Sequence, residues 1–126
     1  MKDDIFCLCD RLWEACFALH QHLRHGHLEK VYENGLANRI GKMSVPFIRQ
    51  HPLSVFDYDG TLLGDFYTDF LTDNRLIIEI KACRTLANEY VAQLLGNLCV
   101  SRIEHGLLIN FGSPRLQIRK FALTPI

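Results

Sequence analysis

The chain has 126 residues, 48% of them hydrophobic, and its fourteen basic side chains balance fourteen acidic ones. This composition is sufficient for a single folded domain over residues 1–126 and excludes a disordered chain. No apolar run is long enough to cross a membrane, and the neutral charge argues against tight, non-specific binding to long DNA.

The N-terminus and the cysteines indicate a reducing compartment. Met1-Lys2-Asp3-Asp4 is acidic from its third residue and lacks the small-residue cleavage site of a signal peptide. The five cysteines are an odd number without CxxC spacing, which is typical of reduced thiols. We therefore expect a cytoplasmic protein.

The first half of the chain predicts two helices followed by a hairpin. Apolar residues recur with a helical period over residues 3–22, and a second helix is expected over about residues 27–40. Residues 45–58 are expected to be extended, and their two prolines indicate an edge strand or a bent entry rather than a central strand. Asp59-Gly60 is a hairpin signal. The inner face of the second helix should carry Leu28, Val31, Leu36 and Ile40.

The second half predicts strands on either side of one more helix. A strand should end near Leu71 and another should cover residues 76–82, followed by a helix over residues 86–101. The last two strands are expected at residues 105–110 and 116–123. The order ααβββαββ predicts an α+β domain in which a mixed central sheet is flanked by helices.

Two of these strands carry charged residues at positions where buried apolar residues are expected. Asp69 lies near the end of one strand, and Glu79 and Lys81 lie on the next, where alternation puts them on the face opposite Ile78 and Ile80. A buried charge is costly unless it is paired or holds a metal. If the intervening turn has three residues, Asp69 faces Glu79 on the same side of the sheet, whereas a turn of two or four residues breaks that alignment.

Two carboxylates held close together repel and shift each other's pKa unless a cation lies between them. A divalent metal with a lysine beside it is the simplest occupant. Magnesium takes hard oxygen ligands and keeps several waters, so one or two carboxylates and a backbone carbonyl are enough to hold it. The alternative is that both acids are ordinary strand-end residues paired with Arg75 or Lys81.

An acid followed by Glu-x-Lys on a hairpin resembles the PD-(D/E)XK nuclease superfamily. Gly26-His27-Leu28-Glu29-Lys30-Val31-Tyr32 is similar to the signature of its small GxxExxY members, and residues 63–69, 92–95 and 106–112 resemble further segments of that family in the same order. The resemblance covers about residues 20–121. It implies a restriction-endonuclease-like core and an Mg²⁺- or Mn²⁺-dependent phosphodiesterase that cleaves nucleic acid, here taken as DNA, with a metal-activated water.

The resemblance also implies roles for individual residues. Asp69, Glu79 and the carbonyl of Ile80 would hold the metal, and Lys81 would neutralise charge developing on the phosphate and orient or deprotonate the attacking water. Glu29 would point toward the site, where it could bind a second metal or a metal-bound water. Its ordinary interpretation is a first-turn acid favoured by the helix dipole.

Three residues are candidates for substrate contact, namely Gln93, His25 and Tyr32. Gln93 lies where related nucleases place a glutamine near the site, but the aromatic residue often found four positions later is Asn97 here. Tyr32 is also explained by packing, with its hydroxyl tied to the edge of the site. His25 could contact phosphate beside Glu29, although solvent-exposed side chains at helix ends are the ordinary interpretation of His20, His22, His25 and His27.

A second interpretation is a nuclease-like binding or assembly module with little catalysis. The neutral charge, the small size and the missing aromatic residue at Asn97 support it. A domain this short has little surface for selecting a substrate. A homodimer or a protein partner would therefore be expected to supply that surface.

Overall fold

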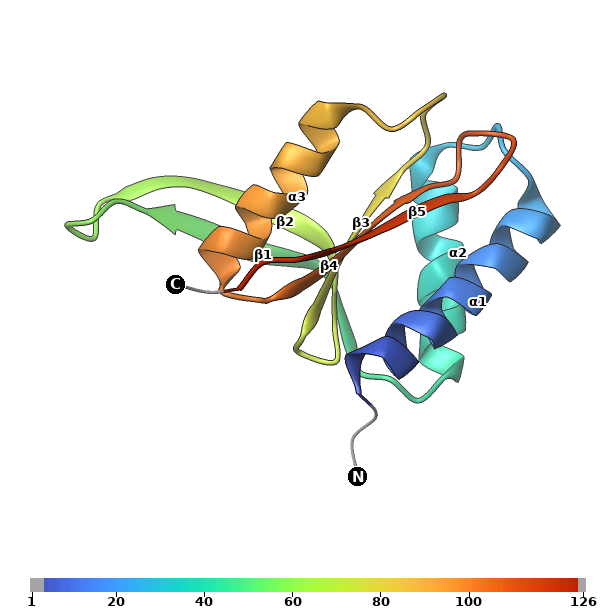
Figure 1. Cartoon of the computed structure of the whole chain (residues 1–126), viewed down its shortest axis with the longest axis horizontal. Coiled ribbons are helices and arrows are strands. Elements are labelled where there is room, and N and C mark those ends of the chain that lie inside the picture. Colours follow the sequence, from blue (N-terminus) through green and yellow to red (C-terminus); the bar gives the residue numbers. More distant parts are fainter. Residues whose placement is uncertain (1–3, 125–126) are drawn as a thin grey trace.

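A computed structural model of the chain describes residues 4–124 and shows a five-stranded sheet with helices on both faces (Figure 1). The elements in chain order are α1 (Ile5–Leu23), α2 (Glu29–Lys42), β1 (Phe47–Phe56), β2 (Leu62–Thr72), β3 (Leu76–Lys81), α3 (Asn88–Ser101), β4 (His105–Asn110) and β5 (Gln117–Ala122). This order confirms the predicted ααβββαββ arrangement and the α+β class. Residues 1–3, which carry most of the signal-peptide argument, lie outside the described residues.

The five strands lie in the sheet in the order in which they occur in the chain. Only β3 and β4 are parallel, with pairs running from Leu76↔His105 to Lys81↔Asn110, and the other neighbours are antiparallel. A parallel pair needs a crossover connection, which α3 supplies. β1 is an edge strand, as expected from Pro52 within it and Pro46 just before it. Within residues 4–124 no helix combines the length and apolar character that a membrane span requires.

Helices α1 and α2 cover one face of the sheet, where Ile78 and Ile80 belong to the same buried cluster as the inner residues of both helices. Helix α2 begins two residues later than predicted, and its first turn does not contribute to the core. Leu28 is 79% exposed and Val31 is also exposed, so the prediction that they face inward is wrong. The buried stripe instead follows the four-residue spacing of Tyr32, Leu36 and Ile40.

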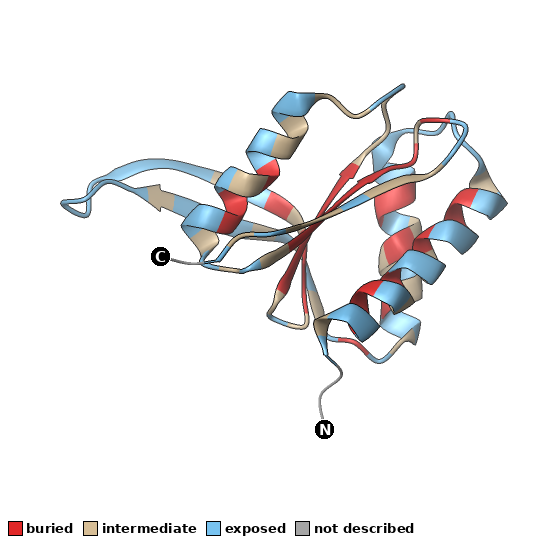
Figure 2. Ribbon diagram, viewed as in Figure 1, coloured by how far each residue is buried: buried red, intermediate tan, exposed pale blue. Residues whose placement is uncertain are grey.

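Helix α3 covers the opposite face, where Leu94 and Leu98 pack with Ile77 and Leu108. A Cβ atom at Gly106 would lie 3.1 Å from a methyl carbon of Leu94, so this glycine lets α3 approach β4 closely. Figure 2 shows β3 and β4 as the buried centre between the two helical layers. The predicted alternation is confirmed, because Ile78 and Ile80 face α1 and α2 while Glu79 bonds to a residue of α3.

The β1–β2 hairpin extends beyond the rest of the sheet. β2 pairs with β3 only from Phe70↔Ile78 to Thr72↔Leu76, whereas the β1–β2 pairs continue to Phe56↔Leu62. The outer part of the hairpin therefore has no third strand beside it and projects from the body of the molecule (Figure 1). We call residues 54–65 the arm. Figure 2 shows that it is largely exposed.

Candidate functional site

The candidate site lies where β2 separates from β3, just beyond the pair Phe70↔Ile78. We call this place, with Asp69 on β2 and residues 79–81 on β3, the fork. The turn between them has three residues, 73–75, the length expected to align Asp69 with Glu79, but the strands do not pair at that position, and it is Thr68 that donates to the Glu79 carboxylate. The last pair of that ladder is Phe70↔Ile78. At the next position Asp69 contacts the neighbouring strand through its side chain, because its Oδ2 accepts a hydrogen bond from the Ile80 N–H at 2.7 Å.

The carbonyl of Ile80 faces this fork. In a strand, the N–H and C=O of one residue point toward the same neighbouring strand, and successive residues alternate. The Lys81 carbonyl points toward β4, where it accepts a hydrogen bond from the Phe111 N–H. The Ile80 carbonyl therefore points the other way, with its own N–H, toward Asp69 on β2.

Glu79 is a buried acid on the α3 face of β3. Its Oε1 accepts hydrogen bonds from Thr68 Oγ1 at 2.6 Å and from Asn97 Nδ2 at 3.1 Å. Burial, with the charge of Asp69 acting in the same direction, raises the pKa of Glu79 to about 7, although the two hydrogen bonds and Lys81 oppose the shift. Asn97, at the position where the resembled family often has an aromatic residue, thus donates a hydrogen bond to the buried acid.

Lys81 lies two residues beyond Glu79 on the same strand. Its Nζ is 4.7 Å from the centre of the Tyr90 ring on α3, a distance at which a cation–π interaction forms. Within the described part of the chain, Lys81 makes no ion pair with Asp69 or Glu79, and Arg75 pairs instead with Asp73 at 2.8 Å. The acids are therefore not neutralised by the simple ion pairs of the alternative interpretation.

Glu29 stands in the first turn of α2, close enough to the fork to respond to its charges. The side chain is exposed overall, but burial of its carboxyl group, with the charge of Asp69, raises the pKa of Glu29 while Lys81 acts to lower it. The structure thus brings both Glu29 and Glu79 within electrostatic reach of Asp69 and Lys81. Their roles in binding or catalysis remain predictions.

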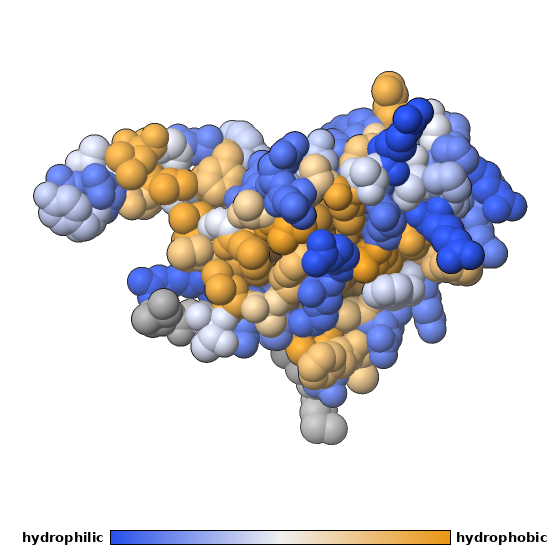
Figure 3. All heavy atoms as spheres, turned by 45° about the horizontal axis from the view of Figure 1, so that its top comes forward, coloured by the Kyte–Doolittle hydropathy of each residue, from blue (hydrophilic) through white to orange (hydrophobic). Residues whose placement is uncertain are grey.

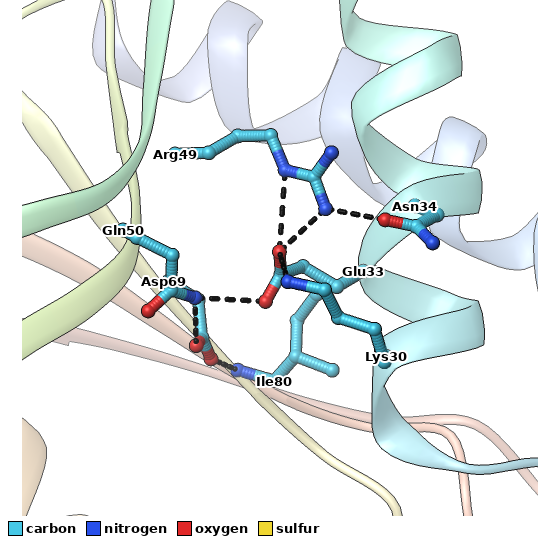
Figure 4. A network of polar contacts seen from close by, with 7 residues as sticks. All are labelled: Lys30, Glu33, Asn34, Arg49, Gln50, Asp69 and Ile80. Carbon is cyan, nitrogen blue, oxygen red and sulfur yellow. Dashed lines mark hydrogen bonds and ion pairs between the residues drawn. The ribbon is translucent and has the colours of Figure 1, made fainter.

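A fifth charged residue, Glu33, was not identified from the sequence. It lies on the buried stripe of α2 and accepts hydrogen bonds from Arg49, Lys30 and Gln50 (Figure 4). Burial acts to raise the pKa of Glu33, but the hydrogen bonds from Arg49 and Lys30 outweigh it and lower that pKa. The available signal was an acid between Tyr32 and Leu36, four residues after Glu29, because that spacing places it near both the apolar stripe and Glu29.

Gln50 connects Glu33 with Asp69. Its Nε2 donates to Glu33 Oε1 at 2.9 Å and to Asp69 Oδ1 at 3.3 Å (Figure 4). The β1–β2 pairs on either side are regular, yet Gln50 itself has φ 49°. A left-handed backbone costs a non-glycine residue about 1 kcal/mol or more, and such residues cluster at functional sites. Nothing in the sequence signals this conformation.

The segment that follows Lys81 is held in place by β4 and the loop after it. Asn110 accepts a hydrogen bond from the Cys83 N–H at 3.0 Å and donates to the Cys83 carbonyl at 2.9 Å. A Cβ atom at Gly112 would lie only 2.3 Å from the backbone nitrogen of Cys83, so only glycine allows this crossing. These contacts tie the backbone just after Lys81 to β4 and to the loop that follows β4.

The structure does not bring the three expected substrate-contact residues together. Tyr32 is fully buried, stacks on Phe111 with ring centres 4.8 Å apart, and donates its hydroxyl hydrogen to the Arg24 carbonyl at 2.5 Å. It has no surface to offer a substrate, so the prediction of a substrate contact is wrong. Gln93 is exposed on α3, one turn from Asn97.

His25 is exposed and lines a shallow hollow of about 450 Å³ together with His27 and Arg84. His20 departs from the expectation of solvent-exposed histidines. It is buried, and its Nε2 donates a hydrogen bond to the Ser113 carbonyl at 3.0 Å. His20 therefore ties α1 to the β4–β5 connection.

The fork residues fit a divalent cation with few protein ligands. Among residues 4–124, no group of three or more His, Cys, Asp or Glu side chains is arranged to hold a metal. The carboxylates of Asp69 and Glu79 and the carbonyl of Ile80 form a smaller set of hard oxygen donors, which suits magnesium or manganese with additional waters. A cation between the acids would also relieve the repulsion that helps raise the pKa of Glu79.

We expect Gln50→Gly to weaken Mn²⁺ binding about tenfold, since residues that orient a metal ligand typically contribute 10- to 100-fold to affinity. Glycine adopts positive φ without strain, so the free energy of unfolding should change little. Calorimetric titration and urea denaturation measure the two quantities. Ser44→Gly is the matched control, because Ser44 also has positive φ and is exposed, but has no bond to the fork. Equal Mn²⁺ affinities for both variants would exclude a role for Gln50.

Comparison with known proteins supports a specific family. A family model described as the PD-(D/E)XK nuclease superfamily matches residues 7–121. Among solved structures, the chain is similar to the crystal structure of SSO0001, with a TM-score of 0.60 and 15% sequence identity over 94% of this chain and 79% of that chain. At this identity the likeness shows the fold alone. A search of curated proteins finds no significant match.

Proposed function

Because the chain belongs to the PD-(D/E)XK nuclease superfamily, we propose that it is a metal-dependent nuclease that hydrolyses phosphodiester bonds of DNA. The observation that carries the proposal is the fork itself. Asp69 is bonded to the Ile80 N–H, and Glu79 and Lys81 flank that residue on the same strand. The segment Gly26–Tyr32 supports placing the protein among the small GxxExxY members.

In this proposal Asp69, Glu79 and the carbonyl of Ile80 hold Mg²⁺ or Mn²⁺, and Glu29 stands near for a second ion or its water. When bound, the cation supplies positive charge at the phosphate and lowers the pKa of water. Glu33 and Gln50 act as positioning residues. Arg49 donates a hydrogen bond to Glu33, which accepts another from the side-chain amide of Gln50. The same amide donates to Asp69 and so orients its carboxylate.

Lys81 neutralises the charge that develops on the phosphate oxygens during hydrolysis. A lysine is a compact cation with flexible geometry, and it acts most strongly where water is partly excluded. Lys81 is half-buried and lies against the Tyr90 ring, which limits the orientations of its ammonium group. His25 and Gln93, both exposed, are the remaining candidates for contact with DNA.

The proposal predicts that Lys81→Met lowers the rate of DNA cleavage about a hundredfold or more, because it removes charge stabilisation in the transition state. Mn²⁺ affinity should stay within a few-fold of wild type, because the ligand oxygens are retained. The measurement is cleavage of labelled single- and double-stranded DNA and RNA with Mn²⁺ or Mg²⁺ at low salt. Lys42→Met removes an exposed cation at the end of α2 and serves as the control.

Cleavage by wild type and by the control, but not by Lys81→Met, would support the proposal and identify the nucleic acid. Cleavage confined to RNA would correct the substrate. Equal cleavage by Lys81→Met would remove Lys81 from the mechanism. Absence of both cleavage and metal binding in wild type would overturn the proposal as a whole.

The second candidate function is a nuclease-like binding or assembly module. The observation that favours it is the state of Glu79, whose Oε1 already accepts two hydrogen bonds and whose pKa near 7 allows a neutral carboxyl group without metal. Calorimetry with Mn²⁺ at pH 8 separates the two candidates. Micromolar binding contradicts an empty site, whereas no binding favours the module.

A further inference from the structure

The arm exposes large apolar side chains far from the candidate site. Every residue from Phe56 to Asp65 is exposed, and Tyr58 at the tip is 96% exposed. Phe56, Leu62 and Leu63 are each more than half exposed. Figure 3 shows hydrophobic atoms on this projection as well as on the body. A two-stranded ribbon with such a surface is marginally stable alone, so a partner that covers it is expected.

The charges on the arm are all negative. Between Arg49 and Arg75 the chain contains five aspartates and neither lysine nor arginine. Three of these acids, Asp57, Asp59 and Asp65, lie on the arm. Phosphates would be repelled by this surface, so nucleic acid is a poor occupant. A protein surface with apolar and basic side chains is complementary to it.

The tip of the arm has a defined conformation. The Asp57 N–H donates to the Thr61 carbonyl at 2.8 Å, and the Gly60 N–H donates to the Asp57 carbonyl at 3.0 Å. The side chain of Asp59 accepts from the Thr61 N–H at 3.0 Å. The sequence Asp57-Tyr58-Asp59 is therefore presented on an ordered turn, which lowers the entropy lost when the tip docks.

A complementary surface lies on the outer face of α1. Trp13 and Phe17 are about half exposed, and they line a hollow of about 380 Å³ together with Arg24 and Arg115. Among residues 4–124, the side chains that line this hollow include no acid. Within residues 4–124, the guanidinium groups of Arg24 and Arg115 make no ion pair or hydrogen bond. We call this hollow the α1 hollow.

The arm and the α1 hollow cannot meet within one molecule, because they lie at opposite ends of it (Figure 1). We propose that two copies of this chain associate reciprocally, with the arm tip of each in the α1 hollow of the other. Tyr58 packs against Trp13 and Phe17, while Asp57 and Asp59 pair with Arg24 and Arg115. Reciprocal docking uses both surfaces of both copies and closes the assembly at a dimer.

A charge exchange tests this proposal by light scattering coupled to size exclusion and by sedimentation equilibrium. The arm variant carries Asp57→Arg and Asp59→Arg, and the hollow variant carries Arg24→Asp and Arg115→Asp. Each variant alone sets like charges against each other, which should weaken self-association about a hundredfold or more. An equimolar mixture restores opposite charges at both contacts, because the basic arm meets the acidic hollow and the acidic arm meets the basic hollow. Lys42→Asp is the control for an unrelated charge change.

A wild-type dimer that each variant loses and the mixture regains, with Lys42→Asp still dimeric, is the expected result. Circular dichroism of each variant checks that loss of the dimer is not loss of the fold. A wild-type monomer at all concentrations would overturn the proposal, as would a dimer insensitive to both variants. Larger species that grow with concentration and share the same sensitivity would overturn the reciprocal arrangement. Cleavage and metal binding do not enter this test, so it is independent of the proposed function.

Discussion

Asp69→Asn is expected to lower metal-dependent cleavage at least about a thousandfold, because it removes a charged ligand where the cation acts on the phosphate. The substitution preserves the shape of the side chain, and the asparagine Oδ1 can still accept the Ile80 N–H. The fold should therefore persist while Mn²⁺ affinity falls. Cleavage rates and calorimetric titration measure the two effects.

Asp73→Asn is the matched control for this variant. Asp73 lies in the β2–β3 turn four residues away, has φ 54° and pairs with Arg75. Asparagine tolerates that left-handed backbone, so the control removes one carboxylate charge without disturbing the turn. Full activity in Asp69→Asn would remove Asp69 from the mechanism. Equal losses in both variants would point to a general effect of charge or stability.

Glu79→Gln is expected to stabilise the metal-free protein while it weakens metal binding. Burial raises the pKa of Glu79 to about 7, so ionising it at pH 8 costs the folded state on the order of 3 kcal/mol relative to an exposed glutamate. Glutamine is neutral and can still accept the hydrogen bonds from Thr68 and Asn97. The same neutrality removes a ligand charge, so Mn²⁺ affinity should fall at least about a hundredfold.

The stabilisation of the metal-free protein by Glu79→Gln should depend on pH. Between pH 4.5 and about 7 the folded protein holds a proton that the unfolded chain has released, so the stability of wild type falls as the pH rises through this window. Below this pH window Glu79 is protonated in both the folded and the unfolded state, so Glu79→Gln should not be more stable than wild type there. Urea denaturation in a chelator at pH 4.5 and pH 8 measures the difference. Wild-type Mn²⁺ affinity should also weaken as the pH drops below 7, because binding displaces this proton.

Glu89→Gln provides the control, because Glu89 is an exposed acid in the first turn of α3. It should change neither the stability difference between pH 4.5 and pH 8 nor the Mn²⁺ affinity by more than a small amount. A Glu79→Gln protein that is less stable than wild type at pH 8 would show that the charged carboxylate is stabilised in the fold. In that case the raised pKa would not describe this residue.

Strong local patterns explain what could be predicted from the sequence. The element order and the opposite faces of Glu79 and Ile80 follow from helical period and strand alternation, which act over a few residues. The sequence left the length of the turn before β3 open, and it did not signal that β2 and β3 stop pairing after Phe70↔Ile78, which sets where Asp69 lies. Leu28 was misplaced because it lies in the α1–α2 connection, and Val31 because the buried stripe of α2 begins one residue later, at Tyr32.

The contacts that were missed depend on residues distant in sequence. Within their own segments Glu33, Gln50 and Asn97 are ordinary polar residues. They become part of the site only through hydrogen bonds that lead to Asp69 and Glu79 on other strands. A left-handed backbone at Gln50 follows from no local preference, since only its surroundings can hold it. Tyr32 was a candidate for substrate contact as well as for packing, and its complete burial assigns it to packing.

The bond between the Ile80 N–H and the Asp69 carboxylate has a spectroscopic consequence. Ladder amides donate to backbone carbonyls, which do not titrate, whereas this amide donates to an ionisable group. In an NMR spectrum, the Ile80 cross-peak should therefore move when a cation displaces or polarises that carboxylate. Its hydrogen exchange should report opening of the fork separately from global unfolding. One backbone resonance would thus follow the site without any substrate or mutation.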